Sequence, residues 1–311
     1  MNKRTHENPP ALSISAVERD IGLGKDTLRV WEKRYGFPTP FRDDFGERLY
    51  PTDQVDKLRV IKRLLDSGHR PGKVVRLELG ELVALAEASH SSTPLTVPPE
   101  ALDQLGGLMD IIKQHDAEGL KQALARMLLE KGLKRFVVDV VAPMNNLVGD
   151  AWAKGQFEVF EEHMYTEIIQ VVLRNAIATL PKASNSPKVL LTTLPGELHG
   201  LGLLMVECML AIEGANTVSL GTQTPVSDIV AACRAHKAEV LGLSFSVTQS
   251  SSSVVESLVE LRKLLPDSVE IWCGGTSSAL RRKSRNEFKL ISDLETVASS
   301  VRAWRKDNPA T

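Results

Sequence analysis

The sequence predicts a multidomain protein of α and α/β class, in which a small helical head and a helix bundle precede a parallel β-sheet domain. Three observations support this order. Two short helical segments and a hairpin signal open the chain, amphipathic helical segments fill the middle, and short β-prone runs alternate with helical stretches in the last part. With 311 residues, the chain is long enough for two or three domains.

Composition and charge indicate a globular, cytoplasmic protein with a basic head. No apolar run reaches the length of a membrane span, and the N-terminus lacks the apolar core of a secretory signal. The 3 cysteines have no CxxC spacing, which favours reduced thiols. Residues 1–80 carry 16 Lys and Arg against 12 Asp and Glu, whereas residues 81–180 carry 8 against 14. Such an asymmetry suits a nucleic-acid-binding head, and the lack of an apolar span argues against a membrane partner.

Two stretches rich in Pro, Ser and Thr divide the chain. Residues 90–100 and 181–187 show no hydrophobic periodicity, so we interpret them as a linker and a domain boundary. The predicted domains are a head over residues 1–87, a linker over 88–100, a bundle over 101–182 and a sheet domain over 187–306.

The head has the pattern of a winged helix-turn-helix. A first helix is expected to start at residues 12–17, followed by a tight turn at 22–24 and a second helix over 25–34. Three basic residues spaced four apart share one face of the second helix: Lys25, Arg29 and Lys33. Gly46 is expected at the tip of a hairpin that carries one arginine on each arm.

This stretch closely resembles the MerR family of transcription regulators. The residues that carry the resemblance are Thr27, Leu28, Arg29, Trp31, Glu32, Tyr35, Gly36, Pro38, Pro40, Arg42, Gly46, Arg48, Tyr50 and Asp53. It implies that the second helix enters the major groove of a double-stranded DNA operator and that the wing arginines hold phosphates. The DNA-binding residues expected on this basis are Lys25, Thr27, Arg29, Lys33, Arg34, Arg42, Arg48 and Tyr50.

The middle of the chain predicts a four-helix bundle. Apolar residues recur at helical spacing in four successive segments between residues 102 and 180, as at Leu120 and Leu124. Breaks between the segments are expected at residues 115–116, at Gly132 and at Gly155.

The last segment predicts a Rossmann-like (flavodoxin-like) domain. Short β-prone runs lie at residues 189–194, 217–220, 240–245 and 271–273. Helical stretches lie between them, at residues 201–213, 226–236 and 253–265. This alternation builds right-handed βαβ units on a parallel sheet. Ligands of such sheets bind beyond the carboxyl ends of the strands, which gives the loops at residues 195–202, 221–225, 246–252 and 274–278.

Three motif pieces lie on these loops. They are Glu197-x-His199-x-x-Gly202, Ser244-x-Ser246 and Gly274-Gly275. Their spacing resembles the cobalamin-binding domains that bind the cofactor with its nucleotide base displaced. In those domains the first piece begins with Asp and the second ends with Leu, so Glu197 and Ser246 are departures.

The resemblance implies a role for each residue. His199 is the expected metal ligand, because imidazole is a suitable nitrogen donor for the cobalt of cobalamin. Glu197 would accept the other ring proton and fix the tautomer. Small or hydroxylated residues would line a slot for the displaced nucleotide tail: Gly202, Ser244, Thr248, Gly274 and Gly275.

Trp152 and the pair Glu162-His163 form a W-x₉-E-H pattern in the bundle. Together with the head and the tail motifs, this pattern resembles the CarH and LitR group of light-responsive, MerR-type cobalamin regulators over nearly the whole chain. The resemblance implies that Trp152 covers the adenosyl group of adenosylcobalamin and that Glu162 and His163 line the pocket around it. Ala153 departs from the group, in which a His after the Trp takes the upper axial position after photolysis.

Three functions fit these features. The first is a DNA-binding repressor gated by adenosylcobalamin, whose homo-oligomer (a dimer or a tetramer) changes when light cleaves the Co–C bond. The second is a MerR-type regulator that is insensitive to light or independent of cobalamin, which Ala153 and Ser246 favour. The third is a corrinoid carrier for methyl transfer, which the DNA-binding head argues against. No nucleophile–base arrangement or phosphate loop in the sequence indicates an enzyme.

Overall fold

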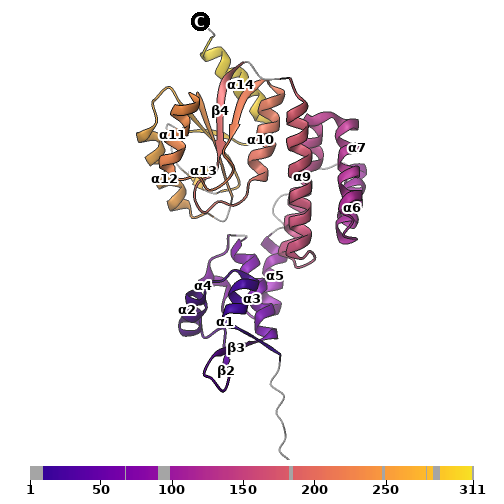
Figure 1. Cartoon of the computed structure of the whole chain (residues 1–311), viewed down its shortest axis with the longest axis vertical. Coiled ribbons are helices and arrows are strands. Elements are labelled where there is room, and N and C mark those ends of the chain that lie inside the picture. The colour runs from indigo at the N-terminus through magenta and orange to yellow at the C-terminus, as the bar shows by residue number, and fades with distance from the viewer. Residues whose placement is uncertain are drawn as a thin grey trace, which may run out of the picture. The chain divides into compact units, whose positions relative to one another are not determined.

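The computed structural model describes residues 10–66, 68–89, 99–181, 185–246, 249–277, 279–282 and 288–309 (Figure 1). The chain forms two compact units. One comprises Met1–Pro94 with Asp150–Gln156, and the other comprises Leu95–Gly149 with Phe157–Thr311. Within the described part of the chain, no helix is long and apolar enough to cross a membrane.

The head is a winged helix-turn-helix, as predicted. Its elements are β1 (Ala11–Ser13), α1 (Ile14–Ile21), α2 (Lys25–Tyr35), β2 (Phe41–Arg42), β3 (Arg48–Pro51), α3 (Thr52–Asp66), α4 (Pro71–Val74) and α5 (Leu79–Ser89). The strands pair antiparallel in the order β1-β3-β2. The first helix starts later than predicted, because Leu12 pairs with Tyr50 in the sheet and the Ser13 side chain caps α1 by accepting the N–H of Ala16.

Helix α2 turns its apolar face into the head. Leu28 and Trp31 are buried in one cluster with Val17 of α1 and Leu58 of α3. Helix α2 exposes Thr27, Arg29 and Lys33 to solvent. Burial of one face therefore presents the predicted DNA-reading face to solvent.

The four predicted helical segments of the bundle are present. They are α6 (Pro99–Lys113), α7 (Ala117–Arg135), the π-helical turn η1 (Phe136–Val141) continued by α8 (Ala142–Ala153), and α9 (Val159–Thr179). Asp116 caps α7 by accepting the N–H of Gly119 at 2.8 Å. Gly132 interrupts α7 with a φ of 73° and a ψ of 157°, which are not helical. The predicted break at Gly132 is thus a left-handed glycine.

The sheet domain contains five parallel strands in the order β5-β4-β6-β7-β8. Its elements are β4 (Asn185–Thr192), α10 (Leu201–Ile212), β5 (Ala215–Ser219), α11 (Val226–His236), β6 (Val240–Phe245), α12 (Ser251–Leu264), β7 (Glu270–Gly275), α13 (Ala279–Arg282), β8 (Lys289–Ile291) and α14 (Glu295–Asp307). Figure 1 shows α11 and α12 on one side of the sheet and α10 and α14 on the other. The prediction missed β8 and α14.

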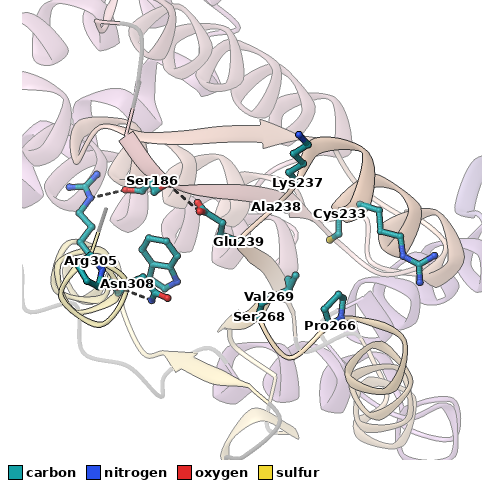
Figure 2. Close-up of a pocket in the computed structure, with 13 residues that line it drawn as sticks. Ser186, Cys233, Lys237, Ala238, Glu239, Pro266, Ser268, Val269, Arg305 and Asn308 are labelled. Atoms are coloured by element: carbon teal, nitrogen blue, oxygen red, sulfur yellow. Dashed lines mark hydrogen bonds between the residues drawn. The ribbon is translucent and has the colours of Figure 1, made fainter. Parts of the chain in front are cut away.

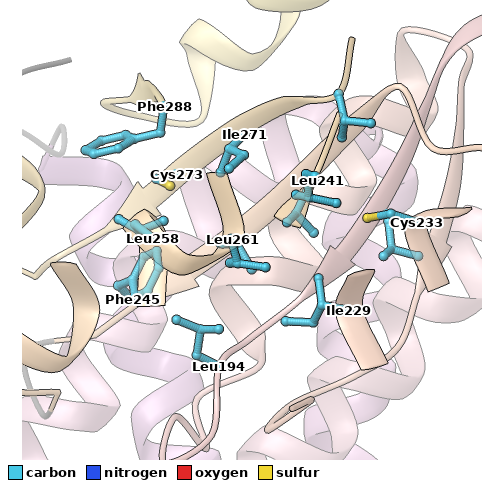
Figure 3. Close-up of a cluster of buried hydrophobic side chains, with 14 of the residues drawn as sticks. Leu194, Ile229, Cys233, Leu241, Phe245, Leu258, Leu261, Ile271, Cys273 and Phe288 are labelled. Atoms are coloured by element: carbon cyan, nitrogen blue, oxygen red, sulfur yellow. The ribbon is translucent and has the colours of Figure 1, made fainter. Parts of the chain in front are cut away.

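The two faces of the sheet have different surroundings. Leu190, Leu241 and Ile271 are register partners that face a continuous apolar core under α11 and α12 (Figure 3). On the opposite face, each next residue along the strands lines a cavity instead. There the row across β4 and β6 is Leu191 and Gly242, and an added Cβ on Gly242 would lie 2.6 Å from a Leu191 methyl group. The cavity lies between this face of the sheet and α10, and its lining combines Gly242, Ser244 and Gly274 with the larger Leu191 and Trp272.

Candidate functional site

The chain order of the sheet reverses at β4, which makes the gap between the ends of β4 and β6 a topological switch point. After β4 the chain crosses to β5 on one side, and it then returns to β6 on the other side. Open α/β sheets bind ligands in the crevice that this reversal leaves. Glu197 follows β4 and Ser246 follows β6, and the N–H of Ser246 donates to Oε2 of Glu197 at 2.7 Å. Two of the three motif pieces therefore meet across the switch point.

Glu197 orients His199. Its Oε1 accepts the backbone N–H of His199 at 3.0 Å and lies 2.7 Å from Nδ1 of the same residue. The Glu197 side chain is fully buried, whereas 61% of the His199 side chain is exposed. The imidazole is thus anchored at one nitrogen and accessible to a ligand.

Hydrogen bonds keep the Glu197 carboxylate charged. Burial raises the pKa of Glu197, but hydrogen bonds from His199 and Ser246 outweigh it and lower the pKa below its ordinary value. An ionised carboxylate only accepts hydrogen bonds. The proton of a neutral His199 therefore lies on Nδ1, and Nε2 carries the lone pair with which imidazole ligates a metal.

A cavity of about 290 Å³ lies between the sheet and helices α10 and α14. Four predicted tail-binding residues line it: Gly202, Ser244, Gly274 and Gly275. An added Cβ on Gly202 would lie 3.3 Å from Oγ of Ser244. At Gly275, whose φ is 112°, it would overlap the carbonyl oxygen of Phe245. We call this cavity the slot.

The slot has the volume and the lining to hold the bicyclic base of the nucleotide tail. A cavity of about 150 Å³ accommodates benzene, and the slot has about 290 Å³. Its walls include the apolar residues Val206 and Val297, while Ser244 offers a hydroxyl. The donor set at His199 and the space at the glycines therefore fit a corrinoid whose nucleotide base has left the cobalt. Thr248, the other predicted tail-binding residue, lies outside the described residues.

The predicted upper-face residues fall in both compact units. Trp152 is half-buried and Ala153 is buried near the end of α8, in the segment that groups with the head. Glu162 and His163 lie in the first turns of α9, in the unit that contains the sheet. His163 is exposed, with Nε2 3.6 Å from Oε2 of Glu162, and Glu162 accepts the hydroxyl of Thr166 at 2.7 Å.

The slot is also connected to the bundle through Met205 of α10. Nδ2 of Asn145 on α8 donates to Sδ of Met205 at 3.7 Å, and its Oδ1 accepts the hydroxyl of Tyr165 on α9 at 2.6 Å. Met205 lines the slot as well. Burial raises the pKa of Tyr165, so its hydroxyl remains a donor at neutral pH.

A larger hollow of about 1010 Å³ opens at the opposite edge of the sheet (Figure 2). It lies where the strands begin, and its lining includes Ser186, Glu239 and Val269. None of the predicted cofactor-binding residues lines it. Because ligands of parallel sheets bind at the carboxyl ends of the strands, the slot and not this hollow is the candidate site.

The head exposes most of the predicted DNA-binding residues. The exposed ones are Thr27, Arg29, Lys33, Arg34 and Arg42, while Lys25 and Arg48 are half-buried. Arg42 and Arg48 are register partners on the two arms of the hairpin, as expected. Tyr50 is buried, and its hydroxyl donates to Glu32, so it contributes to the position of the wing and not to the exposed surface.

Several residues of the candidate site lie outside the three sequence motifs. Thr276, Ser292 and Asp293 line the slot, and Met205 joins it to the bundle. Ser292 and Asp293 follow β8, which is three residues long and therefore gives little periodic signal.

Comparison with known proteins assigns the three parts of the chain. Residues 12–79 match the family described as MerR HTH family regulatory protein, and residues 105–176 and 187–288 each match a family described as B12 binding domain. The fold resembles that of a Methanosarcina barkeri monomethylamine corrinoid protein, with a TM-score of 0.51, 19% identity and coverage of 63% of this chain and 96% of that one.

Two curated relatives are similar to this chain over most of their length. The chain is 27% identical to the HTH-type transcriptional repressor CarH of Myxococcus xanthus, over 85% of this chain and 89% of the relative. It is 26% identical to the HTH-type transcriptional repressor CarA of the same organism, over 75% of this chain and 76% of the relative. The chain is therefore a MerR-type, cobalamin-binding regulator of the CarH-like kind, as the sequence predicts.

Proposed function

We propose that this chain is a transcriptional repressor whose binding to double-stranded DNA is controlled by adenosylcobalamin, which His199 would hold as a ligand of cobalt. The observation that carries the proposal is the buried Glu197 carboxylate, which holds an exposed imidazole at the switch point of the sheet. The slot beside it supports the same reading. The similarity to relatives named as repressors supports the regulatory part.

Each group has a proposed task. Nε2 of His199 binds cobalt, Glu197 holds the proton of Nδ1, and the slot takes the nucleotide tail, with Thr248 as a further hydroxyl. Trp152, Glu162 and His163 are proposed as further cofactor-binding residues. Bound adenosylcobalamin supplies a Co–C bond that light cleaves. On the head, the exposed basic residues of α2 and the wing arginines contact the operator.

Oligomer formation is the proposed link between the cofactor and DNA. An assembly of two or four chains places several heads on one operator, which raises affinity through effective concentration. The adenosyl group controls this equilibrium only if it binds the two assembly states unequally. Gel filtration of the loaded protein in the dark and after green light tests this step, and an unchanged elution volume contradicts it.

The central experiment uses the full chain loaded with adenosylcobalamin in the dark. We expect a corrinoid absorption spectrum, and operator binding that weakens after green light. His199→Ala should lose cofactor, whereas His236→Ala, an exposed histidine at the end of α11, should retain it. Full cofactor retention by His199→Ala contradicts the assignment of the ligand.

A second candidate function is a cobalamin-binding regulator that does not respond to light. The observation that favours it is Ala153, a buried residue without a ligand atom at the position after Trp152. Equal operator affinity in the dark and after illumination, with cobalamin bound in both states, would select this function over the first.

A further inference from the structure

Thr193, directly after β4, connects two loops at the carboxyl edge of the sheet. Its side chain is fully buried. The hydroxyl donates to the carbonyl oxygen of Glu197 at 2.8 Å and accepts the N–H of Gln223 at 2.9 Å. One buried hydroxyl thus links the loop that carries His199 to the loop over residues 221–225.

Further contacts hold residues 221–225 in place. Oγ1 of the neighbouring Thr192 lies 3.0 Å from the carbonyl oxygen of Gly221 and 2.7 Å from Oγ1 of Thr224. The two loops also meet at Gly200, where an added Cβ would lie 3.2 Å from the methyl group of Thr222. The loop over residues 221–225 is therefore a fixed neighbour of the His199 loop.

Gln223 has an unusual backbone conformation in this loop. Its φ is 62°, and its side chain is exposed. Non-glycine residues seldom adopt positive φ, and those that do gather at ligand-binding sites and at the ends of helices. Two other described non-glycine residues with positive φ, His115 and Lys237, follow α6 and α11 closely. Gln223 does not follow a helix, so the end of a helix does not explain its positive φ. Its backbone N–H donates to the hydroxyl of Thr193.

We infer that residues 221–225 are the second part of the corrin-binding platform, with Thr193 as its positioning residue and Gln223 as a further corrin-binding residue. This inference rests on the proposed function, because it requires a corrin at His199. The edge of a corrin ring carries acetamide and propionamide groups. The Gln223 amide has both a donor and an acceptor for such a group, so it recognises the ring and not the nucleotide tail.

Binding titrations of the full chain in the dark test the role of Gln223. The probes are adenosylcobalamin and cobinamide, which keeps the ring amides but lacks the nucleotide. Gln223→Gly allows the left-handed backbone and removes the amide. We expect both probes to bind about fivefold more weakly, as for the loss of one hydrogen bond. Lys237→Gly, also at positive φ but at the other edge of the sheet, is the matched control. Unchanged affinity of Gln223→Gly for both probes overturns the role of Gln223.

Thr193→Val and Thr193→Ser test the positioning role. The valine keeps the shape and removes the hydroxyl, so we expect affinity to fall about tenfold or more. The valine variant should also show a weaker absorption band of the form in which a nitrogen atom of the protein ligates cobalt. The serine keeps the hydroxyl and should restore both. Wild-type behaviour of the valine variant, or failure of the serine variant to restore binding, overturns the role of Thr193. If the valine variant does not fold, the binding affinities of the serine variant and of Gln223→Gly decide whether the inference holds.

The wild type and His199→Ala separate the two proposals. If the wild type binds no cobalamin, or His199→Ala retains all of it, the proposed function fails and this inference fails with it. If His199→Ala loses cobalamin while Thr193→Val and Gln223→Gly bind as the wild type does, only this inference fails.

Discussion

The hydroxyl of Tyr50 donates to Oε1 of Glu32 over 2.7 Å, which ties strand β3 of the wing to helix α2. Nε of Arg48 donates to Oε2 of the same carboxylate at 3.0 Å. Burial and the bond to Glu32 raise the pKa of Tyr50, so its phenol remains a donor. The Glu32 carboxylate therefore fixes the wing relative to the helix that is expected to enter the major groove.

Removing that hydroxyl should loosen the wing. We expect Tyr50→Phe to lower the free energy of unfolding by about 1 kcal/mol, the net value of one hydrogen bond. Operator affinity should fall with it, because the wing arginine is held less firmly. Denaturant unfolding and a gel shift measure the two effects. Glu47→Gln, at the exposed tip of the wing, is the control for stability. An unchanged unfolding curve for Tyr50→Phe would show that this bond contributes nothing.

Arg29 should contribute to DNA binding through its charge. It is exposed on α2, where its Nη1 lies 3.1 Å from Oδ1 of Asp26. We expect Arg29→Ala to weaken operator binding and to reduce the slope of log K against log salt by about 1, as for one lost phosphate contact. Lys121→Ala, an exposed lysine of α7, should change neither quantity. A salt slope equal to that of the wild type would place Arg29 away from the phosphates.

Glu197→Gln should reveal a pH-dependent contribution to stability. The folded pKa of Glu197 lies below the ordinary value of 4.5. Such a group stabilises the folded chain above its unfolded pKa, and the contribution is lost as the pH falls through the folded pKa. The difference in unfolding free energy between the wild type and Glu197→Gln should therefore be largest near neutral pH and shrink below about pH 4.5. A difference that grows on acidification would contradict the lowered pKa.

Filling the slot should discriminate between cofactors with and without a nucleotide. Gly202 and Ser244 are neighbours in the lining of the slot, so a larger side chain at position 202 would take up space that the tail needs. We expect Gly202→Val to weaken adenosylcobalamin binding by about tenfold or more, the scale of overpacking. Cobinamide, which lacks the tail, should bind as before. Gly107→Ala, where an added Cβ meets nothing within 4 Å, is the control. Equal losses for both ligands would place the tail elsewhere.

Local patterns predicted most of the fold. The bounds of β6 are those predicted, and α11 spans the predicted residues 226–236, because a short apolar run and an amphipathic stretch are strong local signals. Strand β8 and the strand pairing of Leu12 were missed. Strand β1, which contains Leu12, and strand β8 each have three residues, and each pairs with a strand that is not its neighbour in a tight hairpin. No local sequence pattern therefore indicates them.

The candidate site was predicted in part, for a similar reason. The motif resemblance predicted that Gly202, Ser244 and Gly274 share one slot, and the structure places them there, near the start of α10 and near the carboxyl ends of β6 and β7. Thr193 has no such signal, because a threonine at the end of an apolar run is compatible with any strand. Its role depends on Gln223, 30 residues away, which only the folded chain brings to its hydroxyl.

The side chain of Met205 belongs to two surfaces at once, since it lines the slot and its sulfur accepts a hydrogen bond from Asn145. Neither surface can be redesigned at this position without altering the other. A variant that no longer binds the ligand would still need a hydrogen-bond partner for Asn145. Changes in the bundle around Asn145 would in turn change the wall of the slot. Because one side chain serves both surfaces, a substitution at Met205 that alters ligand binding also alters the packing of the bundle.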